Sequence, residues 1–101
     1  MGRVARPKPA RLAVKLLQIR VALGLSQNGM LSQLDLDERL FRSAISGYEL
    51  GTREPPLPVL LKYAEEAGIC VDVLINDKLD LPALLPAVPK HEGVRHGTKR
   101  R

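Results

Sequence analysis

Apolar residues recur at helical intervals through most of the chain. Between residues 10 and 24 they are spaced four, three and four positions apart, at Leu12, Leu16, Ile19 and Leu23. This spacing predicts an amphipathic helix with Lys15 and Gln18 on its outer face and Gly24 at its end. Before this helix, residues 1–9 contain two prolines and no periodic pattern, which predicts a flexible arm.

Two further helices are predicted between residues 26 and 50. Ser26 is a suitable N-cap for the first of them, whose buried face would carry Met30 and Leu34. Asp37 and Glu38 are candidates for the first turn of the next helix, because acidic side chains favour that position. The chain between these two helices is therefore predicted to be a short acidic loop.

The segment 41–50 has the clearest division between an apolar and a polar face. Phe41, Ile45 and Tyr48 form one stripe that can pack on a core, and Gly51 stops the helix. The small and polar side chains fall outside this stripe, at Arg42, Ser43, Ser46 and Gly47. A helix with such a face suits a DNA major groove, which is wide enough to admit it. The same pattern also occurs on ordinary surface helices of small bundles.

The remaining apolar pattern predicts two more helices and then a tail. Pro58 suits the first turn of a fourth helix, which Gly68 would end. The predicted buried stripe of this helix is Leu57, Leu60, Leu61, Ala64 and Ala67. Residues 71–75 have the composition of a strand, but their length and their place after four helices favour a last short helix. After residue 76 apolar residues alternate with prolines, which suits an extended segment packed on the domain or on a partner chain.

These elements predict an all-α fold of five helices in one domain over residues 10–77. A basic N-terminal arm, 1–9, precedes the domain, and a proline-containing basic tail, 78–101, follows it. A chain of 101 residues supports one domain with a small core. With 45% hydrophobic but only 3% aromatic residues, that core is expected to be aliphatic.

The net charge of +5 is unevenly distributed. Residues 1–20 carry six basic groups and no acid, residues 21–77 carry four basic and nine acidic groups, and residues 78–101 carry six basic and two acidic groups. The basic ends could bind a polyanion through phosphate contacts, or they could be ordinary solvated ends. The acidic middle disfavours nucleic-acid binding.

Several classes of protein are disfavoured by composition. The single cysteine, Cys70, excludes an internal disulfide and suits a reducing compartment; with His91 and His96 far away in the tail, it does not make a metal site. No apolar run approaches the length of about 18 residues that a membrane span needs. The part expected to be ordered contains no paired-carboxylate, Cys/His or Ser/His constellation and no glycine-rich phosphate loop. We therefore expect a cytoplasmic protein that is not an enzyme and has no cofactor.

Several short motifs, in a fixed order, carry a family resemblance. They are Leu-Gly-Leu-Ser-Gln at 23–27, Ile-Ser-Gly-Tyr-Glu at 45–49, Gly51, Pro55 and Leu-Leu-Lys-Tyr-Ala at 60–64. Together they resemble the phage-repressor/Cro-like (XRE) helix-turn-helix family of DNA-binding transcriptional regulators, over roughly residues 10–76. The resemblance implies a five-helix lambda-repressor-like bundle.

The resemblance also implies roles for individual residues. Base contacts are expected from the residues around the buried Ile45, which are Arg42, Ser43, Ser46 and Gly47. Phosphate contacts are expected from Gln27 and from Thr52 and Arg53. The arm residues Arg3, Arg6 and Lys8 could follow the backbone or enter the minor groove. Gly47 stands where many relatives have a long polar side chain, and it would give close approach rather than read a base.

A structural ion pair between Arg20 and Glu49 is implied by the same resemblance. It would tie the first helix to the end of the segment 41–50. The chain departs from the family pattern between Ser26 and Ile45, where it is about four residues longer. The extra length falls at 35–40, with Asp35 near the place of the family's turn glycine and Leu31 at the place of its small residue. The angle between the second and third helices is therefore open.

The sequence thus predicts a sequence-specific regulator that binds double-stranded DNA by inserting the helix 41–50 in the major groove. It would be a small repressor, or an antitoxin whose C-terminal tail binds a protein partner, and a homodimer is expected. The alternative is a protein-interaction module that keeps the helix-turn-helix fold without reading DNA.

Overall fold

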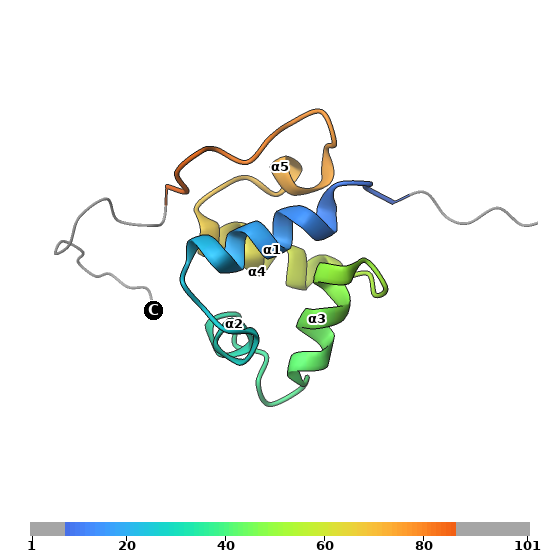
Figure 1. Cartoon of the computed structure of the whole chain (residues 1–101), viewed down its shortest axis with the longest axis vertical. Coiled ribbons are helices and arrows are strands. Elements are labelled where there is room, and N and C mark those ends of the chain that lie inside the picture. The colour runs from blue at the N-terminus through green and yellow to red at the C-terminus, as the bar shows by residue number, and fades with distance from the viewer. Residues whose placement is uncertain (1–7, 87–101) are drawn as a thin grey trace, which may run out of the picture.

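Helix α1 contacts α3, α4 and α5, and α2 packs against α3 (Figure 1). The computed structural model describes residues 8–86, and within that range the chain forms helices and no strand. The helices are α1 (Leu12–Ala22), α2 (Gln27–Gln33), α3 (Arg42–Leu50), α4 (Leu57–Ala67) and α5 (Val71–Ile75). The predicted all-α fold with five helices is confirmed. No helix in this range is long and apolar enough to cross a membrane.

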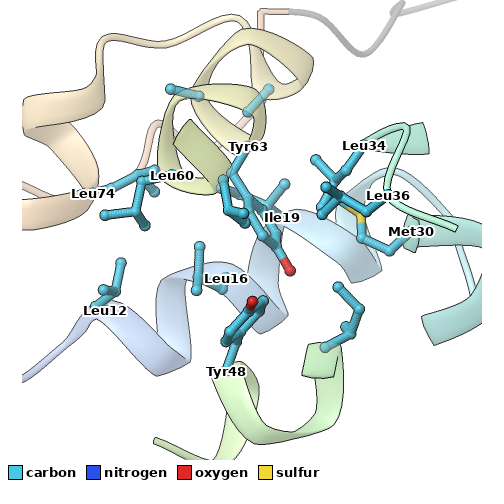
Figure 2. Close-up of a cluster of buried hydrophobic side chains, with 14 of the residues drawn as sticks. Leu12, Leu16, Ile19, Met30, Leu34, Leu36, Tyr48, Leu60, Tyr63 and Leu74 are labelled. Atoms are coloured by element: carbon cyan, nitrogen blue, oxygen red, sulfur yellow. The ribbon is translucent and has the colours of Figure 1, made fainter. Parts of the chain in front are cut away.

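One hydrophobic core joins all five helices (Figure 2). Its largest fully buried apolar side chains are Leu16, Ile19, Met30, Leu34, Ile45, Tyr63 and Leu74. The core is mainly aliphatic, as expected, and the two tyrosines Tyr48 and Tyr63 are its only aromatic members among the described residues. The residues predicted to be buried in the first two helices are buried, with the exception of Leu23, which is partly buried. They are Leu12, Leu16, Ile19, Met30 and Leu34.

The helix ends follow the predicted capping chemistry. The Ser26 hydroxyl accepts a hydrogen bond from the Gly29 amide at 2.9 Å, so Ser26 caps α2. Gly51 and Gly68 end α3 and α4 with φ angles of 79° and 76°, a left-handed conformation that glycine adopts without steric cost. Pro58 lies in the first turn of α4, where its missing amide hydrogen is not needed.

Helix α3 begins later than predicted, and the turn before it is anchored in the core. The predicted start at Asp37 or Glu38 is wrong, because residues 37–39 form a turn and α3 starts at Arg42. Leu36 is buried, and its amide donates to the Leu31 carbonyl at 2.9 Å. Asp35 reverses the chain with a φ of 60°, a left-handed conformation in which aspartate is among the tolerated residues.

The predicted orientations of four side chains are wrong. Phe41 is 80% exposed instead of packing with Ile45 and Tyr48, because α3 starts one residue after it. Leu57 and Leu61 are 77% and 50% exposed, since the buried face of α4 is rotated toward Val59, Leu60 and Tyr63. Lys15 was expected in solvent and is only 1% exposed.

Lys15 is buried because α5 packs beside it. Its ammonium group donates to the carbonyls of Val73 at 2.8 Å and Asn76 at 3.1 Å. These carbonyls lie at the C-terminal end of α5, where helices leave acceptors unsatisfied. Burial lowers the pKa of the Lys15 ammonium. Lys15 therefore caps the C-terminal end of α5 and fixes this five-residue helix to α1.

The segment after α5 is tied back to the start of α1. The Asp77 carboxylate accepts hydrogen bonds from the amides of Ala10 at 2.9 Å and Arg11 at 3.0 Å. The Arg11 side chain donates to the Asp77 carbonyl at 2.7 Å and pairs with Asp80. Further along, Leu85 is buried against the core, so packed structure extends beyond the predicted domain end at residue 77.

We expect this connection to weaken in acid. The two amide hydrogen bonds lower the pKa of Asp77, and the Arg11 guanidinium lowers the pKa of Asp80. Because both folded-state pKa values lie below the ordinary 3.8, their contribution to stability is present above that pH and is lost as the pH falls through the folded values. The protection of the Ala10 and Arg11 amides, which is the ratio of the intrinsic to the observed exchange rate, should therefore fall between pH 6 and about 2.5.

The Asp77→Asn variant serves as the control for this prediction. It should show low protection of the Ala10 and Arg11 amides at every pH, since it lacks the carboxylate. An equal pH dependence in the variant and in the wild type would contradict the proposed role of Asp77.

Candidate nucleic-acid interface

Helix α3 has one face packed on the domain and one face open to solvent. Ala44, Ile45 and Tyr48 are buried and hold α3 against the core. On the other side, Arg42 and Ser43 are exposed and Ser46 is partly buried. The three predicted base-contacting side chains therefore share an accessible surface of one helix.

Gly47 differs from these three residues because the Arg53 side chain lies over it. A Cβ atom added at Gly47 would lie 2.6 Å from Arg53 Cδ and 2.7 Å from Arg53 Cγ, which is too close for any substitution without movement. Gly47 is thus buried, and the predicted open face is interrupted at this position. The glycine is needed here for the close approach of a neighbouring arginine.

The loop after α3 folds back onto the end of that helix. The amides of Thr52 and Arg53 both donate to the Gly47 carbonyl, at 3.0 Å and 3.2 Å. The Arg53 guanidinium carbon lies 6.0 Å from the centre of the Tyr48 ring, at the outer limit of a cation–π contact. Thr52 and Arg53 remain exposed. Thr52 and Arg53, which are predicted to contact phosphate, therefore lie at the C-terminal end of α3, and hydrogen bonds fix their backbone.

Lys8 brings the N-terminal arm to the same loop. Its ammonium group donates to the Gly51 carbonyl at 3.4 Å. Lys8 and Arg53 both line a cavity of about 340 Å³ between the arm and the loop. Two exposed basic residues thus lie on this side of the domain. The other arm residues predicted to contact DNA, Arg3 and Arg6, lie outside the described residues.

The predicted ion pair between Arg20 and Glu49 is present. Arg20 donates to the Glu49 carboxylate through Nε at 2.6 Å and through Nη2 at 3.1 Å, and the two side chains are 18% and 5% exposed. The hydrogen bond to Glu49 raises the pKa of Arg20. Arg20 also donates to the Leu25 carbonyl at 2.9 Å, so this one side chain connects α1, the loop before α2, and α3.

Gln27 belongs to this network rather than standing alone. Its side-chain amide donates to the Glu49 carboxylate at 3.3 Å, and the residue is partly buried. This contact fixes the position of Gln27, the first residue of α2 and a predicted phosphate contact, relative to α3. The geometry places Gln27, like Arg53, at the edge of the α3 surface.

Sequence reasoning missed two residues at the other end of α3. Phe41 and Arg39 are both exposed immediately before the helix. The signal that was available is the four-residue spacing of Leu36 and Leu40, which are buried and partly buried. That spacing assigns the apolar anchors of the turn to the two leucines and leaves Phe41 free of the core.

The described residues hold no group of three metal-binding side chains. No family model, curated protein or solved structure matches the chain.

Proposed function

We propose that this chain is a sequence-specific regulator of transcription that binds double-stranded DNA and inserts α3 in the major groove. The observation that carries the proposal is the two-sided α3, packed through Ile45 and Tyr48 and open at Arg42 and Ser43. The width of the B-DNA major groove admits such a helix, and arginine at its start can donate two hydrogen bonds to guanine.

The residues around the C-terminal end of α3 suit phosphate contacts beside the groove. Lys8, Thr52 and Arg53 lie at one end of the helix, and Gln27 lies beside it at the start of α2. Contacts of this kind fix the orientation of a protein on DNA, while the bases are read by the helix between them. The resemblance to the phage-repressor/Cro-like family supports the same assignment. The basic residues Arg3 and Arg6 of the N-terminal arm would add contacts to the backbone or in the minor groove. A small cytoplasmic repressor, or an antitoxin whose C-terminal tail binds a protein, fits this reading.

We further propose that the regulator acts as a homodimer. Leu57 and Ile75 are exposed on α4 and α5 and line one apolar groove together with the buried Leu60. Joining two copies through this face would bury apolar surface, which favours association. The expected operator then has two half-sites about one helical turn, or roughly 34 Å, apart.

Salt-dependent binding to duplex DNA is the direct test. Sites are first selected from random duplex DNA, and the dissociation constant is then measured between about 50 and 200 mM salt. A DNA-binding domain that contacts several phosphates loses affinity steeply over that range. A selection that enriches no sequence, together with no binding at low salt, would exclude the proposed function.

The two arginines of the interface should have different effects. Arg42→Ala should cost about 1–3 kcal/mol at one base position, or about fivefold to 150-fold in affinity, and relax the preference there. Arg53→Ala should weaken binding to all sequences alike and reduce the salt slope by about one. Lys62→Ala, which removes a positive charge from α4, is the matched control and should bind as the wild type does. An equal loss on all sequences for Arg42→Ala would refute its role.

The alternative function is a protein-interaction module. The acidic turn before α3, with exposed Asp35, Asp37 and Glu38, favours it because these charges repel phosphate. The exposed apolar groove on α4 and α5 would then hold a different protein. Failure of the DNA selection, combined with a specific protein complex that Leu57→Glu abolishes, would establish this alternative.

A further inference from the structure

Phe41 is the most exposed large apolar side chain in the described part of the molecule. It is 80% exposed and is the only phenylalanine of the chain. It occupies the N-cap of α3, where a serine, threonine, asparagine or aspartate is usual, and it makes no side-chain cap. Phe41 therefore contributes neither to the core nor to a side-chain cap, which leaves its ring available to a partner.

The backbone that carries Phe41 is fixed on both sides. Leu40 packs against the core, and its amide donates to the Leu36 carbonyl at 2.9 Å. Ala44 is 1% exposed, and its amide donates to the Phe41 carbonyl at 2.8 Å. The ring is thus presented from a rigid turn, at the leading end of the proposed recognition helix, rather than from a loose loop.

The charges beside Phe41 favour nucleic acid as that partner. Arg39 and Arg42 are exposed on either side of it in the sequence. Three exposed acids, Asp35, Asp37 and Glu38, also precede it, and Asp37 keeps its charge while it accepts a hydrogen bond from Ser32 at 3.1 Å. The two arginines are nevertheless the charged residues nearest to Phe41 in the sequence. An apolar ring flanked by arginines suits a DNA surface, which combines charged phosphates with an exposed apolar group on some bases. In the major groove that group is the C5-methyl group of thymine, with which phenylalanine makes apolar contact.

We propose that Phe41 contacts the methyl group of one thymine in each bound half-site, and so adds a base preference that Arg42 and the serines of α3 do not supply. This inference rests on the proposed DNA-binding function and deepens it. The thymine should lie beside the base position whose preference Arg42→Ala relaxes, because the two residues are adjacent in the chain.

Deoxyuridine substitution tests the contact, since uracil differs from thymine only by the missing methyl group. Each thymine of the selected site is replaced in turn, and binding is measured by fluorescence anisotropy. For the wild type, one replacement per half-site should weaken binding about fourfold, the value expected for one buried methyl group. Phe41→Ala should bind the thymine and uracil duplexes equally, while Phe41→Leu should keep part of the difference. Leu61→Ala, which shortens an exposed apolar side chain on α4 outside the proposed dimer groove, should behave as the wild type does.

The outcomes separate this inference from the proposed function. Salt-dependent, sequence-specific binding without any thymine-to-uracil effect, or a selected half-site without thymine, would overturn the Phe41 contact alone. The Phe41 contact would also be overturned if the wild type bends DNA, Phe41→Ala does not, and the wild type binds thymine and uracil duplexes equally. The ring would then act as a wedge between base pairs. Absence of all duplex binding would overturn both proposals.

Discussion

Glu49→Ala is expected to destabilise the protein by about 3–5 kcal/mol, which is the loss found when one partner of a buried ion pair is removed. The Glu49 carboxylate is 5% exposed and accepts from both Arg20 and Gln27. Without it, the Arg20 guanidinium stays largely buried with only the Leu25 carbonyl as acceptor. Urea unfolding followed by circular dichroism measures the change.

The controls for Glu49 separate the ion pair from a simple loss of charge. Glu65→Ala removes an exposed acid from α4 and should change stability by less than about 0.5 kcal/mol. The double variant Arg20→Met with Glu49→Leu should recover most of the loss, because apolar side chains can replace a buried pair without leaving an unpaired charge. A loss below about 1 kcal/mol for Glu49→Ala would mean that water solvates Arg20 in the variant.

The second large effect is expected at Lys15. Lys15→Ala removes the buried aliphatic part of the side chain and leaves the carbonyls of Val73 and Asn76 without their donor. The three lost methylenes contribute about 0.8 kcal/mol each and the partly buried Val73 carbonyl about 1–3 kcal/mol, while water can replace the donor at the exposed Asn76. The free energy of unfolding should therefore fall by roughly 3–5 kcal/mol. Denaturant unfolding gives the total, and amide exchange shows whether α5 opens first.

Lys15→Met divides this effect into its two parts. Methionine keeps an unbranched apolar side chain in the same space but cannot donate, so it should lose only the cap, about 1–3 kcal/mol. Lys78→Ala, at an exposed position, is the control for charge and should be close to neutral. If Lys15→Met were as unstable as Lys15→Ala, the ammonium group would account for the whole effect and the packing of the stem for none.

The helix ends were predictable because capping is local chemistry. Ser26, Gly51 and Gly68 act on amides and carbonyls within a few residues, and their conformations follow from their own side chains. Lys15 could not be assigned in this way. Its partners lie 58 and 61 residues away, and nothing in the local spacing distinguishes a solvated lysine from one that α5 covers.

The same division holds in the candidate interface. Arg20 and Glu49 could be paired because a whole set of motifs at known spacing indicated the fold that joins them. The burial of Gly47 could not be predicted, because it depends on a side chain six positions later that folds back over the helix. Phe41 was placed wrongly since a period of three to four residues does not show where a helix starts. The four-residue spacing of Leu36 and Leu40 was the signal that these two leucines, and not Phe41, anchor the turn before the helix.

The carboxylate bridge at Asp77 has a consequence for chain topology. The Ala10 amide and Asp77 Oδ2 are 2.9 Å apart, so the five-helix body of the protein begins and ends at nearly the same point. A body with adjacent ends can be closed by a short linker and reopened elsewhere, or inserted as a unit into a loop of a host protein. The exposed turn at 37–39 offers a place to reopen it, and new ends there would lie directly before α3.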